Sequence, residues 1–153
     1  MRPANLGSAI LADIWGPGGS RMVAVSALVY ISVDDQDAAL QAVRDLAGQE
    51  TVQDAVGPHF AFVDPRRAGR STSLVGMLYA WRWLPSVSED GDIQSLEFTG
   101  EKEGDEDILF EAIAPWVRDG SFVVAACEDG RVWRWLFRSG QVFRQTATLS
   151  FEG

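Results

Sequence analysis

The chain has 153 residues, of which 46% are hydrophobic and 23% charged, a balance typical of one globular domain. Thirteen Lys and Arg against 22 Asp and Glu give a net charge of −9, which disfavours sequence-independent binding to nucleic acids. The single cysteine, Cys127, excludes a disulfide within the chain, and no apolar run approaches the roughly 18 residues needed to span a bilayer. We therefore expect a cytoplasmic protein with no membrane segment.

Residues 1–21 differ in composition from the rest of the chain. Apolar side chains recur four residues apart, and a flexible Gly- and Pro-rich linker follows at residues 16–20. We interpret residues 1–21 as a flexible extension, either a leader or a disordered tail, attached to a single domain at residues 22–153. In the competing interpretation the extension is a docking peptide that fills a groove on a partner. Its docking side chains would be Leu6, Ile10, Ile14 and Trp15.

A strand and a helix are predicted to open the domain. Residues 23–33 form a β-prone run that is apolar on both faces, which is typical of a central strand. Asp34 and Asp35 then begin an amphipathic helix that ends at Gly48, because acidic residues favour helix N-termini and glycine favours the position after the end.

Three further strands are predicted before residue 100. A short strand is expected at residues 60–63, followed by a polar loop with three arginines at 66–73. Residues 74–84 are predicted as a strand, and residues 93–99 return beside it after an acidic turn. The aromatic side chains on one face of the longer strand are Tyr79, Trp81 and Trp83.

A second helix is predicted from Asp105 to about residue 118. Asp105 and the acids after it suit the positive end of a helix. Pro115 should kink or tighten the last turn, and Gly120 lies just past the end. The apolar face of this helix comprises Leu109, Ala112, Ile113 and Trp116.

Three strands close the chain, at residues 121–127, 131–138 and 141–152. The dipeptides Asp129-Gly130 and Ser139-Gly140 are typical of the turns between them. In the middle strand Trp133, Trp135 and Phe137 share one face. We expect the second helix to lie on one face of this meander.

The tetrapeptide Trp-Arg-Trp-Leu occurs twice, at residues 81–84 and 133–136. One hypothesis is an internal pseudo-repeat of two helix-plus-three-strand units, and the competing explanation is chance. The same elements can be divided into two strand-helix-strand-strand units, an order that resembles the small-molecule sensor domains of the GyrI-like family in topology alone. We predict an α+β fold, with two helices on one face of a largely antiparallel sheet of about six to seven strands.

The tryptophan-rich strands allow two interpretations. The rings can form the core beneath the helices, because each indole buries a large apolar area. Alternatively, they line an exposed cleft that stacks a planar ligand. That cleft would be lined by Tyr79, Trp81, Trp83, Trp133 and Trp135.

Residues 89–111 hold ten carboxylates and one lysine. They are either a solvated turn and a capped helix, or an interaction surface for a basic partner. The surface would comprise Glu89, Asp90, Asp92, Glu101, Glu103, Asp105 and Asp107. Because Asp90 and Asp92 lack the spacing of a calcium loop, we expect no metal site.

No motif in the chain indicates catalysis. His59 is the single histidine, and no zinc cluster, nucleophile elbow or phosphate-binding glycine pattern accompanies it. We therefore predict a protein that is not an enzyme and carries no cofactor.

Four segments, 93–105, 114–122, 128–130 and 133–135, resemble a pattern found in small uncharacterised bacterial and phage-type proteins. The resemblance covers about residues 79–138 and implies no activity or site residues. We expect a non-enzymatic protein-interaction module that neutralises or adapts a partner through the acidic surface, with a possible second contact from the docking peptide. The alternative is a small-molecule-binding domain with a tryptophan-lined cleft. The sequence leaves the oligomeric state open.

Overall fold

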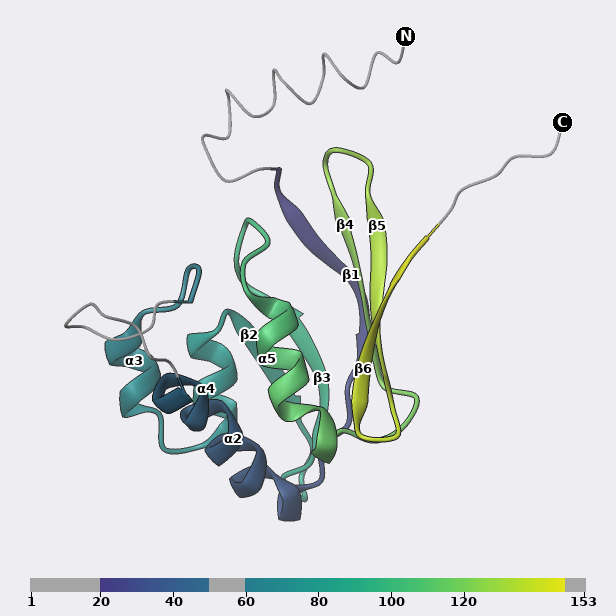
Figure 1. Cartoon of the computed structure of the whole chain (residues 1–153). Coiled ribbons are helices and arrows are strands. Elements are labelled where there is room, and N and C mark those ends of the chain that lie inside the picture. Colours follow the sequence, from purple (N-terminus) through teal and green to yellow (C-terminus); the bar gives the residue numbers. More distant parts are fainter. Residues whose placement is uncertain (1–19, 50–59, 148–153) are drawn as a thin grey trace, which may run out of the picture.

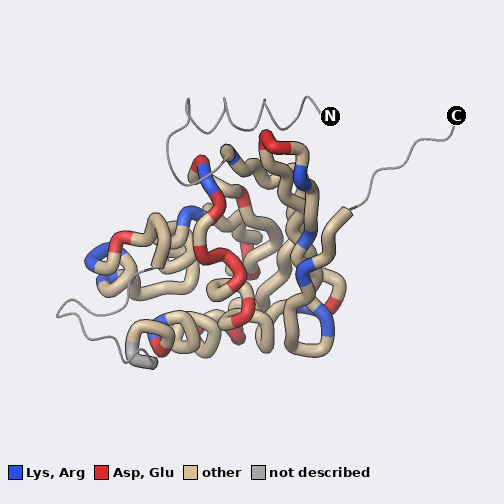
Figure 2. Tube along the Cα trace, turned by 45° about the horizontal axis from the view of Figure 1, so that its top comes forward, with Lys and Arg blue, Asp and Glu red and all other residues tan. Residues whose placement is uncertain are grey.

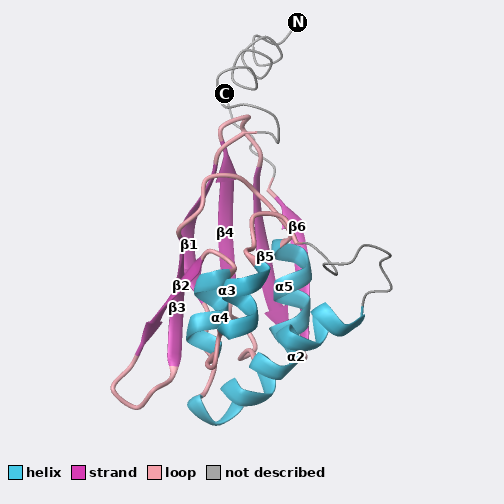
Figure 3. Cartoon of the chain, turned by 90° about the vertical axis from the view of Figure 1, so that its left-hand side faces the viewer, coloured by secondary structure: helices cyan, strands magenta, loops and turns pink. Residues whose placement is uncertain are grey.

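Residues 20–49 and 60–147 are described by the computed structural model of the chain. Helices cover one face of an antiparallel β layer, which confirms the α+β class (Figure 3). The strands are β1 (Met22–Leu28), β2 (Trp83–Val87), β3 (Ile93–Phe98), β4 (Phe122–Cys127), β5 (Val132–Arg138) and β6 (Gln141–Thr146). The helices are α2 (Gln36–Gln49), α3 (Pro65–Arg70), α4 (Leu74–Ala80) and α5 (Glu106–Ile113), with the 3-10 turns η1 (Val33–Asp35) and η2 (Ala114–Trp116).

The strands pair as a four-stranded sheet in the order β1-β4-β5-β6 and as a separate β2-β3 pair. Two antiparallel bridges join the residues that flank β1 to β3 and to the segment after it. Arg21 pairs with Lys102, and Ile31 pairs with Ile93, the first residue of β3. Across the layer the spatial order is therefore β2-β3-β1-β4-β5-β6. The predicted sheet of six to seven strands is present in part, as four strands and two strands whose mutual pairing is interrupted.

A β-bulge in β1 accompanies this interruption. The register of β1 against β4 shifts between Ala24 and Ser26, which makes Val25 the extra residue. A bulge increases the local twist of its strand. Between the two bridges the Ser95 hydroxyl donates to the Ala27 carbonyl at 2.9 Å. A side-chain contact thus holds β3 beside β1 where regular pairing stops.

The core lies between the β layer and the helices (Figure 1). Helices α2 and α5 present apolar faces to the same side of the layer, and β4 and β5 supply the central strand positions. The buried residues of these four elements include Ala39, Leu40, Val43, Leu109, Phe110, Ile113, Val123, Ala125, Trp133, Trp135 and Phe137. One continuous apolar cluster therefore joins the first helix to the last strands.

Both predicted helices are present, with local differences at their ends. Ser32, and not Asp34, supplies the first cap, because its hydroxyl accepts the Asp34 N–H at 3.3 Å. Pro115 tightens the end of α5 into η2, as predicted. Gly120 follows with φ of 90°, a conformation that glycine adopts at little cost.

The strand predicted at residues 74–84 is wrong, because residues 74–80 form helix α4. The Ser73 hydroxyl accepts the Gly76 N–H at 3.1 Å and caps this helix. Leu74, Met77 and Leu78 are buried at three- and four-residue spacing. The aromatic residues that follow lie where the helix ends, so they do not alternate along a strand.

The strand predicted at residues 60–63 is also absent, and this segment forms a turn in which Phe62 has a φ of 63°. The polar loop predicted at 66–73 contains the short helix α3, capped by the Asp64 side chain. Among the described residues between α2 and α5, the strands are therefore β2 and β3. The pseudo-repeat of two helix-plus-three-strand units is accordingly wrong.

The two Trp-Arg-Trp-Leu segments occupy different settings. The first begins at the end of α4, passes through Arg82 with a φ of 75° and continues into β2. The second lies wholly within the central strand β5. Equal sequence therefore does not produce equal structure here.

Within residues 20–49 and 60–147, no helix is both long and apolar enough to cross a membrane.

Candidate functional site

Four of the five aromatic residues considered for a cleft are buried. Trp81, Trp83, Trp133 and Trp135 are each at most 2% exposed. Tyr79 is the exception, and the Arg67 guanidinium stacks over its ring at 4.4 Å. The four indoles therefore occupy the positions that the core interpretation predicts and do not together line an open cleft.

An aromatic cluster connects α5 to both tryptophan segments. The Phe110 ring centroid lies 5.2 Å from that of Trp83 and 5.0 Å from that of Trp135. Trp133 contacts Trp135 edge to face at 5.7 Å. Each such pair adds about 0.5–1.5 kcal/mol beyond area burial. The cluster therefore makes the helix side of β5 a rigid part of the core.

Arg82 lies under the loop between β3 and α5. Its Nη2 donates to the Glu106 carboxylate at 2.8 Å, and its Nη1 donates to the Lys102 carbonyl at 2.7 Å. The guanidinium also lies 4.6 Å from the centroid of the Phe62 ring and 4.9 Å from that of Phe98. Arg82 therefore holds the loop against the core.

Two glycines give Arg82 its space. A Cβ at Gly100 would lie 2.6 Å from Nη1 of Arg82, and one at Gly104 would lie 2.7 Å from Nη2. The Gly104 N–H also donates to the second oxygen of Glu106 at 2.6 Å. Residues 99–106, which carry part of the resemblance described above, are therefore built around a buried guanidinium.

The acidic residues of the β2–β3 turn divide into two groups. Asp92 accepts from the Val33 N–H at 2.8 Å and from the Tyr30 hydroxyl at 2.9 Å, and these bonds lower the pKa of its carboxyl. The bond to Asp92 is in turn the largest cause of the raised pKa of Tyr30. No hydrogen bond or ion pair from the described residues reaches Glu89 or Asp90. Asp92 therefore has a structural role in joining the turn to η1.

The remaining predicted acidic residues bind groups of the same chain. Glu101 pairs with Arg21 at 3.1 Å, and Asp105 accepts the Ala61 N–H at 2.7 Å. Asp105 does not cap α5 with its side chain, contrary to the prediction, because its carboxylate accepts from this more distant N–H. Figure 2 shows acidic positions gathered near the middle of the molecule, beside basic positions on the strands.

Arg144 of β6 links two of these carboxylates. Its Nη1 lies 2.7 Å from Glu103 and 3.3 Å from Asp107, and its guanidinium lies 4.5 Å from the centroid of the Trp133 ring. The Trp135 indole N–H donates to Asp107 at 2.7 Å. Five of the seven predicted acidic residues are thus engaged within the chain, which leaves less free carboxylate for a basic partner than the sequence indicates.

Cys127 and His59 are the remaining candidates for chemistry. Burial raises the pKa of the Cys127 thiol, so this buried side chain is protonated at neutral pH. The described residues contain no group of three His, Cys, Asp or Glu able to hold a metal ion. His59 and the docking residues Leu6, Ile10, Ile14 and Trp15 lie outside the described residues.

The face of the β layer that points away from the helices, which we call the outer face, was not predicted from the sequence. Trp135 points to the helices, so its neighbours in β5 point outward. The strand registers align Leu28 with Phe122, Phe122 with Leu136, and Leu136 with Phe143. These four residues, the apolar row, cross four strands.

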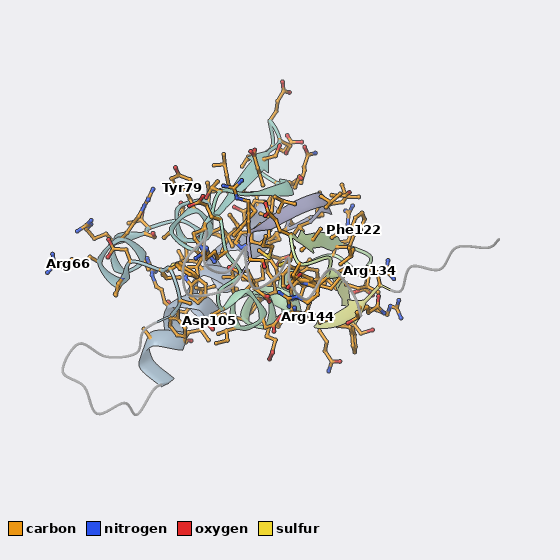
Figure 4. All side chains as sticks on the ribbon, turned by 90° about the horizontal axis from the view of Figure 1, so that it is seen from above. Arg66, Tyr79, Asp105, Phe122, Arg134 and Arg144 are labelled. Atoms are coloured by element: carbon orange, nitrogen blue, oxygen red, sulfur yellow. The ribbon has the colours of Figure 1, made fainter. Side chains whose placement is uncertain are left out.

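The outer face is exposed at the two ends of the apolar row. Leu28 is 58% exposed and Phe143 43% exposed, whereas Leu136 within the row is 7% exposed, and the bulge residue Val25 is 62% exposed. No described helix or strand packs against this side, which is the right-hand side of Figure 1. In Figure 4, Phe122 and Arg134 lie on the opposite side of the molecule from Arg66 and Tyr79 of the helical layer. The signal for this face was present in residues 23–33, which are apolar on both faces.

The charges of the outer face are arranged asymmetrically. Arg134 and Arg138 point outward from β5, whereas Glu97 points outward from β3 beside the exposed Leu84. Arg134 donates to the Gln145 side chain at 2.5 Å, and neither Arg134 nor Glu97 forms an ion pair with a described residue. One side of the apolar row is therefore basic and the other acidic.

Comparisons of the chain with protein-family models, curated proteins and solved structures found no match.

Proposed function

We propose that the chain is a non-enzymatic protein-interaction module that binds its partner through the outer face. The apolar row is the observation that carries this proposal. Leu28 and Phe143 expose large apolar side chains at the two ends of the row, and the bulge residue Val25 of β1 is exposed as well. Contiguous exposed apolar patches mark interaction surfaces in proteins, because leaving them in water forgoes the free energy of burial.

The outer face takes precedence over the acidic surface as the contact region. Glu103 and Asp107 already bind Arg144, and Asp92 binds Tyr30. A basic partner would have to displace these contacts. The exposed ion pairs that it formed in their place would contribute little net free energy. Of the acidic surface, Glu89 and Asp90 in the β2–β3 turn are the carboxylates left to contact a basic group of a partner. Residues 1–21 stay a proposed second docking point.

The alternative of a tryptophan-lined ligand cleft has less support. A cleft would need indole faces open to a planar ligand, whereas Trp83 and Trp135 pack against Phe110 in the core. Pockets that bind small molecules bury most of the ligand between such faces. Leu28 and Phe143 of the outer face are far more exposed than these indoles.

Site-specific photocrosslinking tests the proposal. Benzoylphenylalanine would be placed at Val25 or Phe143 on the outer face, and at the exposed Gln41 of α2 as the control, in the full chain expressed in its own cells. We expect ultraviolet light to produce protein adducts from the first two positions and none from the third. Mass spectrometry would identify the crosslinked protein. Absence of adducts from both outer-face positions would refute the proposed function.

A further inference from the structure

We propose that the partner of the outer face is a second copy of this chain, packed sheet against sheet about a two-fold axis. The inference rests on the proposed function and names its partner. The axis runs parallel to the strands, between β1 and β4, so that it exchanges β1 with β4 and β3 with β5 of the two copies. Aligned packing of this kind is a common way for two sheets to bury their apolar faces.

The apolar row is complementary to itself under this axis. Leu28 of β1 and Phe122 of β4 are paired neighbours on either side of the axis. The rotation therefore places Leu28 against Phe122 of the partner subunit, and Phe122 against the partner subunit's Leu28. Val23 and Ala126 are likewise paired neighbours and exchange in the same way. Apolar side chains of the two copies thus meet at both positions along the strands, the Leu28–Phe122 pair and the Val23–Ala126 pair.

Charge complementarity singles out this arrangement. Counting from the Arg21–Lys102 bridge aligns Glu97 with Ser26, and counting from the Ile31–Ile93 bridge aligns it with Ala27, because the register shifts by one residue between the two bridges. The strand registers align Ser26 with Val124 and Val124 with Arg134. Glu97 and Arg134 therefore lie within about one residue of the same level along the strands, on opposite sides of the axis and each one strand beyond the pair β1-β4. The rotation places Glu97 of each copy opposite Arg134 of the partner subunit, which makes two ion pairs per dimer.

A two-fold axis perpendicular to the strands is less favourable. It would also lay the apolar row on itself, but it would bring Arg134 and Arg138 of β5 onto the same residues of the other copy. Like charges in contact cost free energy. The net charge of −9 does not oppose the favoured packing locally, because the outward charges of the strands are Glu97, Arg134 and Arg138.

The first measurement is the mass of the purified full chain by sedimentation equilibrium. We expect twice the 16.7 kDa of one chain, and a return to 16.7 kDa with Leu28→Asp. Leu28 is half exposed, so this variant should fold, which its circular dichroism and urea unfolding would verify. A charge inserted into the apolar centre should raise the dimer dissociation constant by at least about 100-fold.

Charge reversal tests the geometry. Glu97→Arg and Arg134→Glu should each raise the dissociation constant about tenfold, because each homodimer then contains two like-charge contacts. An equimolar mixture of the two variants should regain the wild-type constant as a heterodimer, since both ion pairs are restored. Glu89→Arg changes the charge equally at the exposed β2–β3 turn and should have no effect.

Failures of the two proposals are distinguishable. A monomer at every concentration whose outer-face crosslinks join a different protein would overturn the dimer and leave the proposed function standing. A monomer with no outer-face crosslinks would overturn both. A monomer that dimerises only after removal of residues 1–19 would show that this segment covers the face, and would overturn the dimer of the full chain. A dimer insensitive to Leu28→Asp and to charge reversal would overturn the interface.

Discussion

The Arg82 guanidinium donates to the Glu106 carboxylate at 2.8 Å within the protein core. Among the ion pairs of residues 20–49 and 60–147, this is the one in which both side chains are largely shielded from water, at 13% and 2% side-chain exposure. Both groups have further hydrogen bonds, to the Lys102 carbonyl and from the Gly104 N–H. A buried pair of this kind is costly to break, because the remaining partner keeps an uncompensated charge.

Arg82→Met should lower the free energy of unfolding by about 3–5 kcal/mol, because Glu106 then stays buried without its cation. Urea unfolding followed by circular dichroism would measure the loss. The matched control is Glu101→Gln, which removes the exposed pair with Arg21 and should cost less than about 1 kcal/mol. Equal losses in the two variants would contradict a structural role for the buried pair.

The glycines around Arg82 yield a second prediction. Gly100→Ala and Gly104→Ala should each lower stability by about 1–3 kcal/mol, because the new Cβ would overlap a guanidinium that hydrogen bonds hold in place. A Cβ at position 104 would also lie only 3.0 Å from the Ala61 carbonyl oxygen. The control is Gly69→Ala in α3. A Cβ there would meet no atom of a distant residue within 4 Å, so stability should be unchanged or slightly higher. If Gly69→Ala lowered the unfolding midpoint as much as Gly100→Ala and Gly104→Ala, the proposed overlap of the new Cβ with the Arg82 guanidinium would be refuted.

The pH dependence of stability supplies a third prediction. Burial raises the pKa of Glu106 above its ordinary value of 4.5, and it outweighs the opposing Gly104 N–H and Arg82. The native state therefore binds this proton more tightly than the unfolded state does. The free energy of unfolding should fall as pH rises from 4.5 toward the raised native value, and the contribution from protonation is complete below 4.5.

Glu106→Gln removes this titration, so its stability should decline less with rising pH than that of the wild type. Urea midpoints measured from about pH 4 to about pH 8 for both proteins would give the difference in slope. Other groups, such as Asp92, titrate equally in both proteins and cancel in the comparison. Parallel curves would show that Glu106 has the same proton affinity in the folded and unfolded chains.

The last three strands were predictable because their turns are determined locally. Gly130 has a φ of 96°, and Ser139 and Gly140 have φ of 56° and 73°, values that turn residues of these types adopt readily. The recurrence of Trp133, Trp135 and Phe137 at every second residue, with Arg134 and Arg138 on the other face, then assigns the faces of β5. Neither feature depends on contacts with distant segments.

The acidic residues could not be assigned from local pattern. Glu103 and Asp107 read as free carboxylates in the sequence, and their partner Arg144 lies 41 and 37 residues later. The role of Arg82 is equally non-local, since the Glu106 carboxylate that binds it is 24 residues away. Charge counting finds such residues but not what they bind.

Helix α4 was missed for a different reason. Tyr79, Trp81 and Trp83 recur at every second residue, which fits a strand, while Leu74, Met77 and Leu78 fit a helical face. A short apolar run satisfies both periods. The deciding signal was Ser73, whose hydroxyl can accept a backbone N–H at a helix start.

Ser73→Ala should therefore lower the free energy of unfolding by about 1 kcal/mol, because the Gly76 N–H loses its acceptor at 3.1 Å. Thr72→Ala is the matched control, an exposed hydroxyl one residue earlier that makes no hydrogen bond within the described residues, and it should change stability by less than about 0.5 kcal/mol. Ser73→Asp should retain stability, since a carboxylate also accepts at this position. Loss of stability in Ser73→Asp equal to that in Ser73→Ala would show that the hydroxyl acts otherwise than as a cap.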